Sequence, residues 1–272
     1  MKTHTTVDTF RDLHTGEEVL ILVNVWDAAS ACVVAGTGAK AIATSSASLC
    51  WAHGYRDGTR EFPDESMLPA VKEIVGATKL PVTVDLEAGY SDDPQMVAER
   101  VLNLSTLGVA GINLEDGAGD PDLLAEKIRA IRERLEEKGA DIFVNARTDT
   151  FLRPLVAPEQ RLKETIARGN FYTQAGADGF FVPRLSDPDQ MRVISEEVKL
   201  PLNVLAFPEV PPLDVLRSHG VRRLSLGALP YEKVLGELRK QANNVLAHGH
   251  TPELFAEAIP YAEMNRVFRL TA

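Results

Sequence analysis

The chain has 272 residues, of which 44% are hydrophobic and 25% charged, values typical of a globular protein with a sizeable core. Its formal net charge of −10, with no basic run to offset it, argues against nucleic acid and anionic membrane surfaces as partners. The sequence lacks a signal-peptide core, and its two cysteines, Cys32 and Cys50, show no metal-type spacing, so we expect a reduced, cytoplasmic setting.

Eight short apolar runs rich in β-branched residues recur along the chain and alternate with helical patterns. In chain order they are LILVNV (20–25), KAIATS (40–45), PVTVDL (81–86), VAGINLE (109–115), DIFVNAR (141–147), ADGFFVP (177–183), PLNVLAF (201–207) and VRRLSLG (221–227). Strands that alternate with helices predict parallel βαβ units. Eight such units in roughly 250 residues predict an α/β protein with the (β/α)8 TIM-barrel fold.

Glycine stands just before four of these runs, at Gly38, Gly108, Gly176 and Gly220. Glycine in this place suits the left-handed residue that ends the preceding helix. Four similar turns indicate repeated units within one domain rather than a linker between two. We therefore expect a single TIM-barrel domain over residues 1–272.

The segments between the runs carry helical patterns. Segment 93–108 begins with an aspartate cap at Asp93 followed by proline, and segment 121–139 has an apolar stripe and a charged outer face. Residues from about 230 to 272 exceed what the barrel needs, and 252–270 predicts an extra amphipathic helix. We expect these C-terminal helices to cap the base of the barrel or to pack on a neighbouring subunit.

Polar residues gather where the predicted strands end, which is where TIM barrels carry their chemistry. Asp85 and Glu87 lie two residues apart in the third run, so strand alternation predicts both on one face, and Glu115 ends the fourth run. Three carboxylates from adjacent strands indicate a hard divalent cation, and oxygen ligands favour Mg²⁺, or Mn²⁺, over zinc. The alternative is solvated loop carboxylates or helix caps, the interpretation preferred for Asp27 and Asp93.

Other residue types in these loops leave two interpretations open. Arg147 ends the fifth run as either a structural ion pair or a planar fork for a substrate carboxylate. The turn TSSAS (44–48) offers hydroxyl and amide groups to an anion, or is only a turn. His53 is either a polar loop residue or a proton donor. No lysine ends a predicted strand, which makes a Schiff-base aldolase a poor candidate.

Several segments together resemble the isocitrate lyase/phosphoenolpyruvate mutase superfamily. They are NVWDAASA, ATSSAS followed by GYRDG, VDLEAGY, GINLEDG, NARTDTF, GADGFFVP and PLNVLAF, which occur in this order between about residues 10 and 230. The resemblance implies a barrel whose Mg²⁺ chelates a 2-oxo acid or an enolate-forming substrate. It also implies a homotetramer, built as a dimer of dimers that exchange a helix.

The resemblance also implies roles for individual residues. Asp85 matches the direct metal ligand, and Glu87 matches the next acidic position. Glu115 matches a residue that contacts the metal through water or through another ligand. Asp57 matches an aspartate near the metal. The other matched positions contact the substrate: Arg147 binds its oxygens, Asn203 lines the pocket, and its carboxylate is held by Ser45, Ser46 and Ala47. Within this set Arg147, Asp57 and Ser45 are the catalytic candidates, and His53 is a further candidate for substrate contact.

The loop after the fourth run departs from the pattern of the superfamily. The lyases carry there a mobile loop with a catalytic cysteine, whereas this chain reads EDGAGDPDLLAEK, without cysteine or histidine. The Asn, Thr or Lys groups of the phosphonate-processing branches are absent too. We therefore expect an Mg²⁺-dependent lyase or decarboxylase that cleaves a C–C bond of a small 2-oxo or 2-hydroxy di- or tricarboxylate through an enolate. The alternatives are a phosphonomutase-like enzyme, of the carboxyvinyl-carboxyphosphonate or phosphoenolpyruvate type, and a 2-oxo-acid-binding protein with little turnover.

Overall fold

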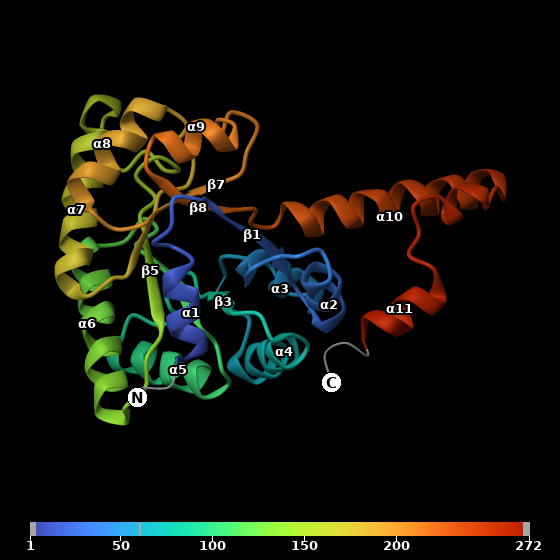
Figure 1. Ribbon diagram of the computed structural model, residues 1–272, viewed down its shortest axis with the longest axis horizontal. Coiled ribbons are helices and arrows are strands. Elements are labelled where there is room, and N and C mark those ends of the chain that lie inside the picture. Colours follow the sequence, from blue (N-terminus) through green and yellow to red (C-terminus); the bar gives the residue numbers. More distant parts are fainter. Residues whose placement is uncertain (1–3, 60, 269–272) are drawn as a thin grey trace.

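The computed structural model describes residues 4–59 and 61–268. Within them, eight parallel strands close into a barrel in the order of the chain (Figure 1). The strands are β1 (Leu20–Val25), β2 (Ile42–Thr44), β3 (Val82–Asp85), β4 (Gly111–Glu115), β5 (Phe143–Arg147), β6 (Gly179–Phe181), β7 (Leu202–Leu205) and β8 (Val221–Ser225). Each lies inside one of the eight apolar runs, so the predicted (β/α)8 architecture is confirmed.

Helices connect the strands and surround the barrel. They are α1 (Thr6–Asp12), α2 (Ala28–Ala35), α3 (Ser46–Ala52), α4 (Asp64–Gly76), α5 (Pro94–Thr106), α6 (Pro121–Lys138), α7 (Arg161–Ala175), α8 (Pro188–Val198), α9 (Leu213–Ser218), α10 (Leu229–His248) and α11 (Tyr261–Val267), with 3₁₀ turns η1 (Pro158–Gln160) and η2 (Pro252–Phe255). Asp27 and Asp93 are helix N-caps, since their carboxylates accept from Ser30 N and Gln95 N. The four predicted turn glycines have φ of 88°, 89°, 107° and 85°, the left-handed values that L-residues avoid.

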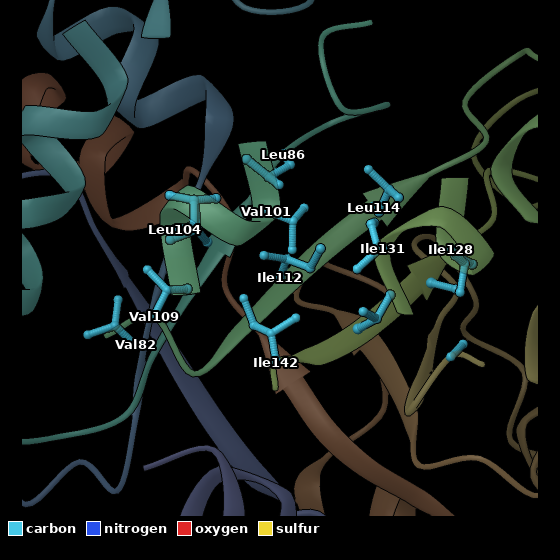
Figure 2. Close-up of a cluster of buried hydrophobic side chains, with 14 of the residues drawn as sticks. Val82, Leu86, Val101, Leu104, Val109, Ile112, Leu114, Ile128, Ile131 and Ile142 are labelled. Atoms are coloured by element: carbon cyan, nitrogen blue, oxygen red, sulfur yellow. The ribbon is translucent and has the colours of Figure 1, made fainter. Parts of the chain in front are cut away.

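The larger core lies between the barrel and the helices. Figure 2 shows part of it, where Ile112 and Leu114 of β4 pack with Val101 of α5 and with Ile128 and Ile131 of α6. These side chains are fully buried. Burying one such side chain contributes about 1.5–3 kcal/mol, so this layer fixes where the strand ends point.

A smaller core fills the base of the barrel and includes the N-terminal helix α1. Phe10 of α1 is fully buried and meets Phe143 edge to face at 5.4 Å, while His14 stacks on Phe143 at 4.4 Å. Gly111 allows this approach, because a Cβ there would lie 2.7 Å from the Phe10 ring. Burial lowers the pKa of His14 to about 3, so the ring is neutral at physiological pH. The base is thus closed by the N-terminal helix and not by the C-terminal ones.

The C-terminal arm, residues 229–268, projects from the barrel as α10 and then turns back through η2 and α11 (Figure 1). The predicted continuous helix over 252–270 is wrong: Glu257 has φ 58° and Pro260 is extended, so only η2 and α11 are helical. Residues 269 and 270 of that prediction lie outside the described residues. No helix in the described part of the chain is long and apolar enough to cross a membrane.

Candidate active site

Acidic and basic side chains converge where β3, β4 and β5 end. Asp85 ends β3, Glu115 ends β4 and Arg147 ends β5, and Glu115 is the register partner of Arg147. All three are only partly exposed. The charge of Asp85 acts on the pKa of both Glu115 and Arg147. The barrel therefore brings these predicted site residues to one end.

Glu87 reaches the same place by a route that the strand pattern did not predict. β3 ends at Asp85, and Glu87 lies in a loop with φ 48°, followed by Gly89 at 89° and Tyr90 at 57°. We call residues 86–91 the Glu87 loop. Its left-handed residues, rather than strand alternation, turn the Glu87 carboxylate toward Asp57 and Asp85. Burial, followed by the charges of these two aspartates, raises the pKa of Glu87.

The loop after α3 contributes a further carboxylate. Asp57 accepts hydrogen bonds from the Ser46 hydroxyl and the Gly58 N–H, and Gly58 N–H also donates to Glu87. Ser46 N donates to Asp85 Oδ2 at 3.2 Å. Although the Asp57 residue as a whole is exposed, its carboxyl group faces the cluster. Ser46 thus joins the two aspartates.

Cys50 is a neighbour of the cluster that the sequence did not reveal. Its Sγ lies within 4.8 Å of carboxylate oxygens of Asp57 and Glu87. Burial and the surrounding acidic groups raise the pKa of the thiol to about 12, so it remains protonated at neutral pH. Because a protonated thiol is a poor metal ligand, the carboxylate oxygens are the candidate ligands in this cluster.

The carboxylates fit a hard divalent cation. Asp85 Oδ1 and Glu87 Oε1 are buried and have no hydrogen-bond partner. A buried charged oxygen without a partner is costly, and a cation bound by several carboxylates offsets that cost. Glu87 and Asp57 have carboxylate oxygens within 4.8 Å of each other and could hold such an ion. Asp85, with its buried free oxygen, is the third candidate, and Glu115 lies at the next strand end.

Burial also changes the protonation of the cluster. It raises the pKa of Glu87 to about 7 and that of Glu115 to about 8, with smaller contributions from the neighbouring carboxylates, and it raises the pKa of Asp57. For Glu115 the Arg147 guanidinium opposes this effect. Metal binding to this set therefore releases protons and strengthens with pH.

In the metal-free protein we expect the free energy of unfolding to decrease between about pH 5 and 8. A glutamate in the unfolded chain loses its proton near pH 4.3, whereas folded Glu87 keeps it to about pH 7, so the stabilisation present at low pH is lost as pH rises. The expected share of Glu87 is on the order of 2–3 kcal/mol. Urea denaturation in EDTA measures it.

Glu87→Gln is the control for this prediction, because glutamine cannot titrate. The variant should lose less stability than the wild type over the same pH range. An equal loss in both proteins would contradict the assignment to Glu87.

Arg147 is fixed by ion pairs on two of its nitrogens. Nη1 lies 2.6 Å from Glu115 Oε2, Nε donates to Asp149 Oδ1 at 2.8 Å, and the guanidinium lies over the Phe181 ring at 5.6 Å. Burial alone would lower the pKa of Arg147, but the charges of Glu115 and Asp149 outweigh it and raise the pKa, so the group stays charged. No hydrogen bond among the described residues uses Nη2. Arg147 therefore forms structural ion pairs and still has one nitrogen, Nη2, that can donate a hydrogen bond.

A buried hydrogen-bond network supports the position of Arg147. We call it the brace, and it consists of Asp149, Asp116, Arg168 and Tyr172. Asp149 N donates to Asp116 Oδ1 at 3.0 Å. Asp116 Oδ2 accepts from Arg168 at 2.9 Å and from the Tyr172 hydroxyl at 2.7 Å. Asp149 and Tyr172 are fully buried. The brace fixes the Asp149 backbone and, through it, the orientation of Arg147.

The remaining predicted site residues lie in two other places. Ser45 is the buried N-cap residue of α3 and makes no cap hydrogen bond, and Ala47 is half-buried beside it. His53 ends α3, exposed, with Nδ1 2.9 Å from Leu49 O and its ring against Phe62. Asn203 is buried in the barrel, where its Oδ1 accepts from Ser225 at 3.2 Å and its Nδ2 has no partner.

The barrel interior also contains a cation that the sequence analysis missed. Arg223 is fully buried and donates to Asn113 Oδ1 and Ser225 Oγ, each at 3.1 Å. Burial lowers its pKa to about 9, and the charge of Asp85 opposes the shift. Strand alternation contains the signal, since Arg223 lies two residues before Ser225 and shares its face.

Comparison with known proteins identifies the family. The family model described as phosphoenolpyruvate phosphomutase matches residues 10–246, which cover all eight strands. The chain belongs to this family. This agrees with the superfamily indicated by the sequence motifs.

Three relatives illustrate the range of the phosphoenolpyruvate phosphomutase family around this chain. A crystal structure from Burkholderia cenocepacia J2315, provisionally described as a phosphonomutase, is 41% identical with a TM-score of 0.82, covering 89% of this chain and 100% of that one. An uncharacterised protein of Mycobacterium tuberculosis is 36% identical over 260 residues, 94% of each chain. The 2-methylisocitrate lyase of Halalkalibacterium halodurans is 26% identical over 251 residues, 84% of this chain and 80% of that protein. The family thus includes proteins named as mutases and as lyases.

Proposed function

We propose that the protein is an Mg²⁺-dependent carbon–carbon lyase, of the oxo-acid-lyase or carboxy-lyase type. Its substrate is a small 2-oxo or 2-hydroxy di- or tricarboxylate. The observation that carries this proposal is the pair of buried, unpartnered oxygens, Asp85 Oδ1 and Glu87 Oε1, beside the guanidinium of Arg147. Carboxylate oxygens favour Mg²⁺, with Mn²⁺ as the alternative ion.

In the proposed reaction the acidic residues and Arg147 have different chemical roles. Breaking a bond next to a carbonyl leaves an enolate, and a bound divalent cation supplies Lewis acidity toward its oxygen. Asp85, Glu87 and Asp57 would hold that ion, with Glu115 at its edge. Arg147 donates to substrate oxygens from a position fixed before the reaction, which is how prearranged donors lower the energy of developing charge.

The substrate carboxylate is assigned to the turn after β2. Ser45 contributes a buried hydroxyl group there and Ala47 its amide, while Ser46, whose hydroxyl donates to Asp57, lies between them. Asn203 Nδ2 is a buried donor without a partner, which supports a polar contact with substrate. For the exposed His53 we retain a role as a substrate contact at the rim.

A phosphonomutase-like activity is the second candidate. It is favoured by the description of the matching family model and by the Burkholderia cenocepacia relative. Against it, β4 and α6 are joined by only residues 116–120, DGAGD, so the loop carries none of the Asn, Thr or Lys groups expected of that branch. The third candidate is a protein that binds 2-oxo acids with little turnover.

A substrate panel distinguishes the three. We expect pyruvate or another 2-oxo acid to be released from oxaloacetate, a 2-methylmalate-type acid or 2-methylisocitrate, with activity lost in EDTA and restored by Mg²⁺. Conversion of phosphonopyruvate, followed by ³¹P NMR, would instead establish the mutase. Metal-dependent oxalate binding with no turnover on any acid would establish the binding protein and reject the lyase.

We also propose that a second copy of the chain covers the C-terminal arm, within a homotetramer built as a dimer of helix-exchanged dimers. Of the 15 exposed large hydrophobic side chains in the described part of the chain, 10 lie between Leu229 and Phe268. An apolar groove between α2 and α10, lined by Trp26, Val33 and Val234, continues this surface. Exposed apolar area of this extent is typical of an interface.

Replacing Leu238 and Leu246 with glutamate should break this association. They are 62% and 86% exposed on α10, so the monomer tolerates the change, whereas a buried interface does not. Light scattering should give a wild-type mass near four times 29.7 kDa and at most half of it for the double variant. Met96→Glu, at an exposed site on α5, is the control. A monomeric wild type would refute the proposal.

A further inference from the structure

The Glu87 loop has a backbone conformation that its own sequence does not favour. Glu87 and Tyr90 have φ of 48° and 57°, the left-handed region in which side chains are disfavoured. Gly89 lies between them at 89°, and a Cβ there would meet Val97 at 2.8 Å. Such a conformation persists only where surrounding contacts determine it, and it is common at ligand sites.

One side chain outside the loop makes several of those contacts. Arg100 of α5 donates from Nη1 to Gly89 O at 2.6 Å, and its guanidinium lies 5.8 Å from the centre of the Tyr90 ring. Its Nε and Nη2 donate to the two carboxylate oxygens of Asp64 at 2.7 and 2.9 Å. Because Asp64 binds Nε and Nη2 in a bidentate pair, the guanidinium is fixed in the plane that brings Nη1 to the loop.

Tyr90 extends this chain of contacts to the metal-ligand candidate. Its hydroxyl hydrogen-bonds to the Glu87 carboxylate, and burial keeps the phenol neutral by raising its pKa. On the other side of the loop, Lys127 Nζ donates to Ala88 O at 2.8 Å, and Glu115 N donates to Glu87 O at 2.8 Å. Arg100 is the member of this set that acts on both the loop backbone and Tyr90.

We propose that Arg100 is a positioning residue that holds Glu87, through Gly89 and Tyr90, in the geometry required to bind a divalent cation. This inference rests on the proposed metal-dependent function. Arg100 does not touch the ligand atoms itself. It limits the conformations of the loop before the ion arrives, so less ordering is left for the binding step.

Binding of Mn²⁺, followed by the EPR signal of the free ion, tests the proposal without any substrate. For Arg100→Met we expect the Kd for Mn²⁺ to increase about 10- to 100-fold, the usual effect of removing a group that orients a ligand. Arg134→Met is the matched control. Like Arg100, Arg134 pairs with a carboxylate of a neighbouring helix, here Glu99 of α5 at 2.9 Å. Within the described part of the chain it makes no hydrogen bond or ion pair with the Glu87 loop. For Arg134→Met the Kd for Mn²⁺ should change less than about 2-fold.

The outcomes separate this inference from the proposed function. If the wild type does not bind Mn²⁺, the metal site and the inference both fail. If the wild type binds and Arg100→Met binds equally well, only the inference fails. Should Arg100→Met not fold, Arg100→Lys takes its place, since lysine keeps the charge opposite Asp64 but cannot contact Asp64 and Gly89 O together.

A double-mutant cycle tests the route through Tyr90. Tyr90→Phe removes the hydroxyl that reaches Glu87 and should weaken Mn²⁺ binding by itself. If Arg100 acts through Tyr90, the double variant Arg100→Met/Tyr90→Phe should bind hardly worse than the weaker single variant. Fully multiplicative effects on the Kd would show that Arg100 does not act through Tyr90 and would overturn that part of the proposal.

Discussion

The variant Arg147→Lys is expected to lower kcat/KM about 100- to 1000-fold, the loss typical of removing one prearranged donor from a charge-stabilising site. Lysine keeps the positive charge but cannot reach Glu115 and Asp149 together while it also donates to substrate. Steady-state kinetics on the acid identified by the substrate panel measures the effect. Arg147→Ala is the less informative change, since it removes the ion-pair partner of Glu115 and one of the two partners of Asp149, and breaking a buried pair costs about 3–5 kcal/mol of stability.

Arg153→Ala is the control for this experiment. Arg153 pairs with the other oxygen of Asp149, at 2.9 Å, but its side chain is 49% exposed and lies outside the cluster. Exposed pairs contribute about 1 kcal/mol or less, so activity should remain within a few fold of the wild type. Arg147→Lys with wild-type kinetics would mean that Arg147 is only a structural ion pair.

The second large effect is expected for Asp85→Asn. Asparagine keeps the shape of the side chain and can still accept from Ser46 N, but it removes the charge whose Oδ1 has no partner. We expect the Mg²⁺-dependent increase in Tm to disappear and kcat to fall more than about 100-fold, beyond the effect of losing an orienting group. Differential scanning calorimetry with Mg²⁺ and with EDTA measures the first of these.

In EDTA the same variant should differ in stability from the wild type by no more than about 1 kcal/mol, because the relief of repulsion among the carboxylates is offset by the lost attraction of Asp85 to Arg147 and Arg223. Asp93→Asn provides the comparison, since Asp93 is an exposed helix cap for which asparagine is equally suited. That variant should keep the response to Mg²⁺. An Asp85→Asn protein that Mg²⁺ still stabilises would rule out Asp85 as a metal ligand.

Sequence reasoning was most successful where one local rule determined the outcome. The alternating apolar runs, the left-handed glycines such as Gly108 and the caps Asp27 and Asp93 depend on neighbours in sequence, and all are found as predicted. The convergence of Asp85, Glu115 and Arg147 also followed, because the strand order of a barrel determines which strand ends meet.

Features that depend on distant contacts were not predicted. Helix α1 is only seven residues long, and its role at the base depends on the contact between Phe10 and Gly111. Cys50 comes near Glu87 only because helix α3, which follows β2, and the Glu87 loop, which follows β3, meet at the same end of the barrel. Glu87 departs from the strand pattern because β3 ends at Asp85 and Glu87 is itself left-handed, which a period of two cannot indicate.

The closed base has a consequence for how products leave. With Phe10 and His14 filling one end of the barrel, substrate and both products of a cleavage share a single opening at the other end. Under the proposed lyase function, the fragment bound by the metal and the Ser45 turn is the one expected to depart last. Release is then ordered: the last product competes with substrate for the empty enzyme, whereas the first inhibits noncompetitively. Product-inhibition patterns would therefore identify which fragment stays behind.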